Sequence, residues 1–303
     1  MADAGDMLWT IIGIGIVGGG LYLAYKNKDK LAGILGGLKK GGGFKLPLPA
    51  LSGPKTNTSN GSQVVTRPGG AAIKFAAAGD WESGRHNVWK NTVANIKKLS
   101  PSVILFPGDF SYSGGPGKWA PVTNALKGAR LVGARGNHDT NGDYGKTFNN
   151  YSNGVVTIGD TSIMSLDTET GSSTVSWARA NLKKMAGRWK IVQFHKPIYR
   201  SSAAHGYDEG HIGALIPDFA RAKINLVIAG HSHNYERFAP KNGVTYTVVG
   251  TGGAHFHGFK GKTAGSVKQI KNQFGCLLCT TGLSMSCRFV SNSGKVLDSW
   301  TMR

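Results

Sequence analysis

Five short, mostly apolar runs in this chain each end at residues whose side chains bind metal ions. The runs are 73–79, 103–107, 131–135, 191–194 and 224–229, and the residues that follow them include Asp80, Asp109, Asn137, His195, His231 and His233. Short apolar runs bounded in this way are typical of buried strands. Because the carboxyl ends of parallel strands meet at one edge of a sheet, these side chains are expected to lie close together. The pattern therefore predicts a polar site at that edge.

Helical patterns alternate with these runs. Residues 87–99 carry apolar side chains at helical spacing, Ser173 can cap a helix that continues to Met185, and residues 210–222 form a third candidate. The last third of the chain alternates like strands, at residues 244–249, 274–280, 283–290 and 296–302, with a turn at 291–294. The pattern predicts an α/β fold in which two mixed sheets face each other and helices lie outside.

The three cysteines lie close together, at Cys276, Cys279 and Cys287. An odd number gives no complete disulfide framework, and the pair Cys276 and Cys279 has the spacing of a zinc-binding or redox motif. The region around Cys287 alternates like a strand, which favours cysteines with a structural role.

Residues 7–25 carry no charged side chain, and Trp9, Tyr22 and Tyr25 lie near the ends of this segment. At about 1.5 Å per residue, a helix of this length nearly spans a hydrocarbon core of about 30 Å. A cleaved signal peptide is the alternative, but Asp3 and Asp6 precede the segment where such a peptide carries basic residues. The sequence therefore predicts a single N-terminal transmembrane helix within an anchor at residues 1–25.

The chain is strongly basic, with a formal net charge of +20. Residues 26–70 combine many lysines with Gly, Pro and Ser, which predicts a basic, flexible linker before a domain at residues 71–303. The charge predicts attraction to anionic lipid, nucleic acid or a phosphorylated substrate. The positive-inside rule favours an inner or cytoplasmic position for the domain, at a cellular or a viral membrane.

The residue types at the strand ends favour a particular chemistry. Carboxylates suit hard cations, whereas imidazoles suit zinc, manganese and iron. Two such ions about 3.5–4 Å apart assist phosphoryl transfer, and a carboxylate can bridge them.

The motifs resemble those of the metallophosphoesterase superfamily, and of the small, tartrate-resistant-like purple acid phosphatases in particular. They are Asp80, Gly108-Asp109-Phe110-Ser111-Tyr112, Gly136-Asn137-His138-Asp139, His195 and Gly230-His231-Ser232-His233. The resemblance extends over residues 71–303 and implies a four-layer α/β/β/α sandwich of two mixed sheets.

The resemblance also implies a ligand set for two ions. Fe(III) would be bound by Asp80, Asp109, Tyr112 and His233, and the second ion, Fe(II), Zn or Mn, by Asp109, Asn137, His195 and His231. The residue that discriminates this family from other metallophosphoesterases is Tyr112, whose phenolate colours the ferric protein purple. A packed ring without a metal is the alternative for Tyr112.

Further residues have implied or open roles. By resemblance, His138 and His205 contact the phosphate and assist the leaving group, although His205 is also consistent with a loop histidine that has no function. Asp139 is expected to orient the loop or a histidine. The family has Gly where this chain has Glu82, which could point away from the site, pair with Arg85 or contact a metal. His255 and His257 are expected at the substrate rim, with a third metal site as the alternative.

The resemblance implies a phosphatase that hydrolyses phosphomonoesters by in-line attack of a metal-bound hydroxide, and the N-terminal segment adds the expectation that it is anchored in a membrane. One alternative is a structural membrane, virion or nucleic-acid-associated protein with a phosphatase-like fold. The other is a phosphodiesterase.

Overall fold

The computed structural model describes residues 11–17, 20–25, 63–65, 71–83, 87–112, 116–139, 148, 152–205 and 210–303. The chain divides into two units, Met1–Thr58 and Ser59–Arg303, and each is described by itself.

In the first unit, the strands β1 (Ile11–Val17) and β2 (Gly20–Tyr25) pair in antiparallel register. The transmembrane helix predicted within residues 1–25 is therefore wrong for residues 11–17 and 20–25, which form strands. Among the described residues, no helix is long and apolar enough to cross a membrane. The physical reason lies in the composition of the segment, because β-branched Ile and Val favour strands and the interspersed glycines weaken a helix. The rest of residues 1–25 lies outside the described residues.

The second unit contains two sheets. In the eight-stranded sheet the spatial order is β13 (Ser266–Ile270), β11 (Tyr235–Phe238), β12 (Thr245–Val249), β10 (Leu226–Ala229), β9 (Trp189–Phe194), β8 (Thr161–Ser165), β7 (Gly154–Ile158) and β3 (Gln63–Val65). In the six-stranded sheet the order is β16 (Val296–Met302), β15 (Met285–Ser291), β14 (Gly275–Thr280), β4 (Lys74–Ala77), β5 (Val103–Pro107) and β6 (Arg130–Ala134). Strand β3 falls in the predicted linker, so these residues belong to a sheet instead; most of residues 26–70 lie outside the described part of the chain.

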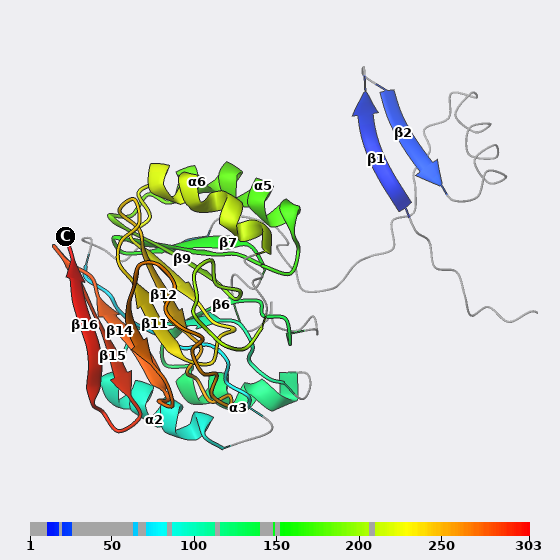
Figure 1. Ribbon diagram of the computed structural model, residues 1–303. Helices are drawn as coiled ribbons and strands as arrows, with labels where there is room; N and C mark the ends of the chain where they lie inside the picture. The colour runs from blue at the N-terminus through cyan, green and yellow to red at the C-terminus, as the bar shows by residue number, and fades with distance from the viewer. Residues whose placement is uncertain are drawn as a thin grey trace, which may run out of the picture. The chain divides into compact units, whose positions relative to one another are not determined.

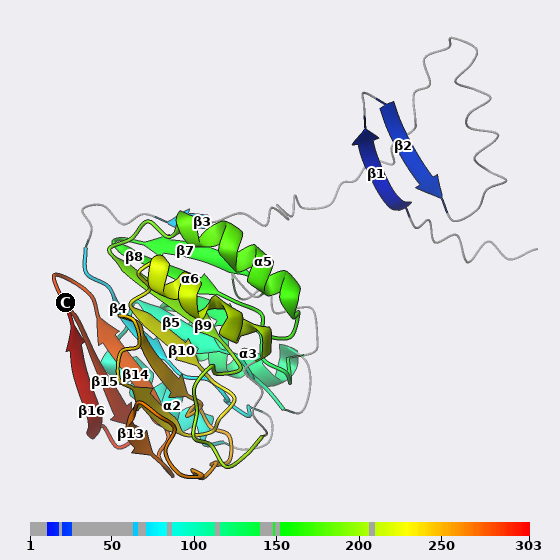
Figure 2. The same cartoon turned by 45° about the horizontal axis from the view of Figure 1, so that its top comes forward.

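Helices cover the outer face of each sheet (Figure 1). The helices on the eight-stranded sheet are α5 (Ser172–Asn181) and α6 (Ile216–Arg221), with the 3-10 turns η2 (Leu182–Lys184) and η3 (Gly210–Leu215). On the six-stranded sheet they are α2 (Trp89–Leu99) and α3 (Pro116–Leu126). Figure 2 shows the same order of helix, sheet, sheet and helix from a second direction. The predicted two-sheet α/β fold is confirmed.

The apolar runs are explained by burial on both faces of each sheet. On β5, Ile104 packs under the outer helices, whereas Leu105 faces the other sheet. On β9, Ile191 faces inward and Val192 packs under α5 and α6. A strand covered on both sides reads as a continuous apolar run rather than an alternating one.

The three predicted helices lie where they were expected, but the capping residue of one and the helix type of another differ. The helix predicted for residues 87–99 is α2. Ser173 does not cap α5, because the helix begins at Ser172. The preceding Gly171 has a φ angle of 66°, in the left-handed region. The Ser173 hydroxyl instead donates to the carbonyl of Thr170 at 2.8 Å. Residues 210–222 divide into a 3-10 turn and a short α-helix.

The three cysteines are buried on the strands β14 and β15. Cys279 and Cys287 face each other across β14 and β15 and form a disulfide. Cys276 lies on the opposite face of β14 and is buried under the outer helices, where burial raises the pKa of its thiol to about 12. Residues three apart on a strand point to opposite faces, so Cys276 and Cys279 cannot bind one zinc ion together.

Candidate metal centre

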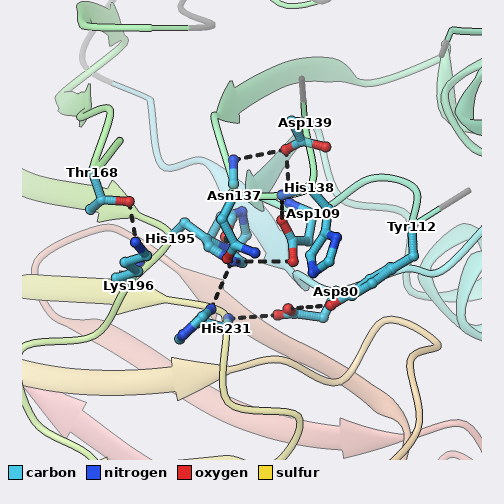
Figure 3. Close-up of polar contacts among 12 residues, drawn as sticks. Asp80, Asp109, Tyr112, Asn137, His138, Asp139, Thr168, His195, Lys196 and His231 are labelled. Atoms are coloured by element: carbon cyan, nitrogen blue, oxygen red, sulfur yellow. Dashed lines mark hydrogen bonds and ion pairs between the residues drawn. The ribbon is translucent and has the colours of Figure 1, made fainter. Parts of the chain in front are cut away.

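The site lies where the carboxyl ends of parallel strands from the two sheets meet. In the six-stranded sheet, β4, β5 and β6 are parallel, and they lead to Asp80, Asp109 and Asn137. In the eight-stranded sheet, β9 and β10 are parallel, and they lead to His195 and His231. Figure 3 shows these five side chains pointing toward one another, with Tyr112 beside Asp80.

The backbone at three of these positions is strained. Asp80, Asp109 and His231 have φ angles of 59°, 54° and 67°, in the left-handed region that non-glycine residues seldom adopt. A glycine lets the chain pass close to Asp109, because a Cβ on Gly136 would lie 2.1 Å from Asp109 Oδ1. Strain of this kind costs about 1–3 kcal/mol per residue and is concentrated at functional sites.

One half of the site consists of Asp80, Tyr112 and His233. The Tyr112 hydroxyl donates to Asp80 Oδ1 at 3.0 Å and lies 2.7 Å from His233 Nε2. His233 Nε2 in turn lies 3.3 Å from Asp80 Oδ1. Burial, together with the charges of Asp80 and Asp109, raises the pKa of Tyr112 far above its usual value, so the phenol is neutral until a cation displaces its proton.

The other half consists of Asp109, Asn137, His195 and His231. His195 Nε2 lies 3.0 Å from Asn137 Oδ1, 3.3 Å from Asp109 Oδ2 and 3.2 Å from His231 Nδ1. Donor atoms of Asp80, Asp109 and His195 all lie within 4.8 Å of one another. Asp109 is therefore close to both halves, where a bridging ligand would be needed.

The buried charges influence each other strongly. Burial opposes ionisation of Asp109, but the neighbouring His195 outweighs it and lowers the pKa of this carboxyl. Burial likewise opposes protonation of His195, yet Asp109 raises the pKa of this imidazole to about 10. The pKa of His231 falls to about 2, first because of burial and then because of His195. A cation at this point would replace the proton that these groups otherwise share.

The histidine tautomers fit metal binding. His195 Nδ1 lies 2.9 Å from the carbonyl oxygen of Pro107, and His233 Nδ1 lies 2.6 Å from that of His255. A carbonyl oxygen only accepts, so both Nδ1 atoms donate, and each Nε2 is directed into the site. This is the usual arrangement of histidines that bind metals. With two carboxylates, an amide and a phenol beside them, the residues fit two cations of the iron, zinc and manganese class.

Asp139 is fully buried behind Asp109. Its carboxylate accepts from the backbone N–H groups of Asp109 at 2.9 Å, Phe110 at 3.0 Å and Gly136 at 2.8 Å. Burial and the charge of Asp109 raise the pKa of Asp139 to about 8. Asp139 thus ties the Asp109 turn to the Asn137 turn.

His138 lies beside Tyr112, and His205 lies over His231. The exposed His138 ring lies 4.3 Å from the Tyr112 ring, and its backbone N–H donates to Asp109 Oδ1 at 3.0 Å. The His205 ring stacks on His231 at 4.2 Å. Burial and the nearby Arg200 lower the pKa of His205. The two rings thus contact residues of different halves of the site.

The Glu82 side chain lies against the loop that carries His255. This Glu82 side chain is 2% exposed, and its Oε2 accepts from the backbone N–H of His255 at 3.2 Å. Arg85, the partner considered from the sequence, lies outside the described residues. His255 is exposed, whereas His257 is buried and its ring stacks on His233 at 3.8 Å. One nitrogen from each of His233, His255 and His257 lies within 4.8 Å of the others. His233 Nε2 is also directed at Tyr112, so this trio shares His233 with the half of the site that contains Asp80.

The sequence reasoning missed Arg200. Its guanidinium donates to the carbonyl oxygens of Ala204 at 2.9 Å and His205 at 3.2 Å, which holds the loop that presents His205. No local signal in the sequence marks the contacts of Arg200 with these two carbonyl groups.

A family model described as calcineurin-like phosphoesterase matches residues 73–235, more than half of the chain. The chain belongs to the calcineurin-like phosphoesterase family. Among curated relatives of this calcineurin-like protein, purple acid phosphatase 21 of Arabidopsis thaliana is 29% identical over 228 residues, covering 62% of this chain and 52% of the relative. Purple acid phosphatase 18 of the same plant is 28% identical over 228 residues, covering 63% and 52%. The chain thus spans about half the length of these relatives.

Solved structures share the fold. Purple acid phosphatase PPD1 from yellow lupin seeds superposes with a TM-score of 0.60 at 18% identity, covering 80% of this chain and 54% of the lupin chain. The protein GAP50, described as the anchor in the inner membrane complex of Plasmodium, superposes with a TM-score of 0.62 at 20% identity, covering 77% and 89%. At these identities the likeness concerns the fold alone.

Proposed function

We propose that this calcineurin-like protein is a dinuclear-metal phosphatase that hydrolyses phosphomonoesters. The observation that carries the proposal is the position of the Tyr112 hydroxyl, 3.0 Å from Asp80 Oδ1 and 2.7 Å from His233 Nε2. A phenol, a carboxylate and an imidazole in contact suit a ferric ion. We assign this ion to Asp80, Asp109, Tyr112 and His233, and a second ion, Fe(II), Zn or Mn, to Asp109, Asn137, His195 and His231.

The protein groups around the cations have distinct tasks in this proposal. When bound, two cations would neutralise the phosphoryl oxygens and lower the pKa of the attacking water. His138, beside Tyr112, and His205, over His231, lie on two sides of the centre and can hydrogen-bond the phosphoryl group or donate a proton to the departing oxygen. Asp139 holds the backbones of Asp109 and Gly136 together through hydrogen bonds to their N–H groups.

The test is hydrolysis by the purified full chain. We expect turnover of p-nitrophenyl phosphate with Fe(III) plus Zn(II) or Mn(II), loss of turnover with a chelator and recovery when the ions return. Bis(p-nitrophenyl) phosphate is expected to react more slowly; the reverse order would favour the phosphodiesterase alternative. Absence of metal-dependent turnover of either ester would refute the proposal. Duplex DNA binding that weakens steeply with salt, without turnover, would favour the structural alternative.

We also propose that residues 7–25 attach the chain to a membrane. The support comes from the sequence, where an uncharged segment precedes a run of lysines. The expected result is that the full chain floats with vesicles rich in phosphatidylserine, even in high salt, and that a chain without residues 1–25 does not. Equal flotation of the two chains, or flotation of neither, would contradict attachment through this segment.

The side of the membrane is a separate question. The lysines favour an inner position, whereas disulfides such as Cys279–Cys287 are typical of oxidising compartments. Protection of the domain from protease added to intact cells distinguishes the two.

A further inference from the structure

Glu82 has an unusual combination of backbone and side-chain environment. Its φ angle is 49°, in the left-handed region, although it is not a glycine. Its carboxylate is almost completely buried. Both features cost free energy, so the position calls for a compensating role.

The backbone around Glu82 runs beside the loop at residues 249–257. The N–H of Gly79 donates to Val249 at 2.8 Å, that of Gly252 to Gly79 at 2.8 Å and that of Ala254 to Asp80 at 2.8 Å. The next N–H in this series belongs to His255, and its acceptor is the Glu82 side chain at 3.2 Å. The Glu82 side chain thus adds one more hydrogen bond between this segment and the loop.

The loop that Glu82 holds is directly bonded to His233. The His255 carbonyl accepts from His233 Nδ1 at 2.6 Å, and the His257 Nδ1 accepts from the His233 backbone N–H at 3.1 Å. The His257 backbone N–H donates to the His233 carbonyl at 3.0 Å. The loop therefore fixes both the backbone and the ring of His233.

We propose that Glu82 is a positioning residue that orients His233 through the backbone of His255. The path has two hydrogen bonds, from His255 N–H to Glu82 and from His233 Nδ1–H to the His255 carbonyl. With Nδ1 engaged as a donor, His233 presents Nε2 to Tyr112 and Asp80. This inference rests on the proposed function, because it assigns His233 to the ferric ion.

The test compares Glu82→Gly and Glu82→Gln in the full chain. Glycine removes the acceptor and adopts a φ of 49° without strain, so Glu82→Gly is expected to fold with an unchanged or raised Tm. Glutamine keeps an oxygen acceptor and serves as the matched control. In metal-free protein, hydrogen exchange of the His255 amide is expected to accelerate in Glu82→Gly and to stay close to wild type in Glu82→Gln.

The second readout is the formation of the visible absorption band when Fe(III) is supplied as its nitrilotriacetate complex. In Glu82→Gly we expect the Fe(III) concentration for half-formation to rise about 10–100-fold, as for other partners of metal-binding histidines, and the band to shift. Glu82→Gln is expected to resemble wild type.

Three outcomes would overturn the inference. Unchanged amide exchange in Glu82→Gly would remove the contact on which the path depends. An unchanged Fe(III) titration and band in Glu82→Gly, with a normal wild-type band, would refute the positioning role and leave the proposed function intact. A wild-type chain that neither binds Fe(III) nor hydrolyses phosphate would refute the proposed function and this inference with it.

Discussion

Asp109→Asn is expected to abolish metal-dependent hydrolysis, with a loss greater than the roughly 100-fold that removal of an outer partner of a metal ligand can cause. Asp109 lies between the two halves of the site, 3.3 Å from His195 Nε2 and within 4.8 Å of a donor atom of Asp80. Asparagine keeps the shape but offers one neutral oxygen, so it cannot bridge two cations as a carboxylate does. The measurements are turnover of p-nitrophenyl phosphate and metal content per chain, of which we expect at least one ion to be lost.

The matched control is Asp160→Asn. Asp160 lies in the turn between β7 and β8, where its carboxylate accepts from the Arg188 N–H at 2.8 Å. This turn is at the end of the sheet where β9 begins, whereas His195 follows the other end of β9. Asp160→Asn is expected to retain both ions and turnover. If Asp109→Asn turned over substrate at the wild-type rate, the assignment of Asp109 as the bridging ligand would be wrong.

The sequence predicted the strands that lead to the motifs, and the meeting point of the motifs, because both depend on local patterns. Runs such as residues 103–107 are apolar throughout, since β5 is covered on both faces. Helix α3 was not predicted, because Pro116 and Pro121 interrupt its pattern. Proline is tolerated in the first turn of a helix, and Pro121 shows that packing can outweigh an unfavourable residue further along.

Other features depend on contacts between distant parts of the chain, and the sequence alone could not give them. Glu82 meets the His255 N–H across 173 positions, so its orientation was left open between three alternatives. The predicted cap at Ser173 was wrong because Gly171, with a left-handed φ, sets the start of α5 instead. For residues 7–25, apolar length predicted a helix, whereas glycines weaken a helix and β-branched residues favour the strands β1 and β2.

Tyr112→Phe is expected to remove the visible absorption band of the iron-loaded protein while leaving the fold intact. The ring packs beside His138 at 4.3 Å and edge-on against His233 at 5.7 Å, and phenylalanine preserves both contacts. Only the oxygen beside Asp80 and His233 is lost, and with it the phenolate that a ferric ion would bind. Absorption across the visible range and iron per chain are the measurements. Tyr246→Phe is the control, because the Tyr246 hydroxyl has no hydrogen-bond partner among the described residues and its removal is expected to leave the colour unchanged. A Tyr112→Phe protein that kept the wild-type band would show that another group colours the iron, and the purple acid phosphatase assignment of the ferric ligands would fail.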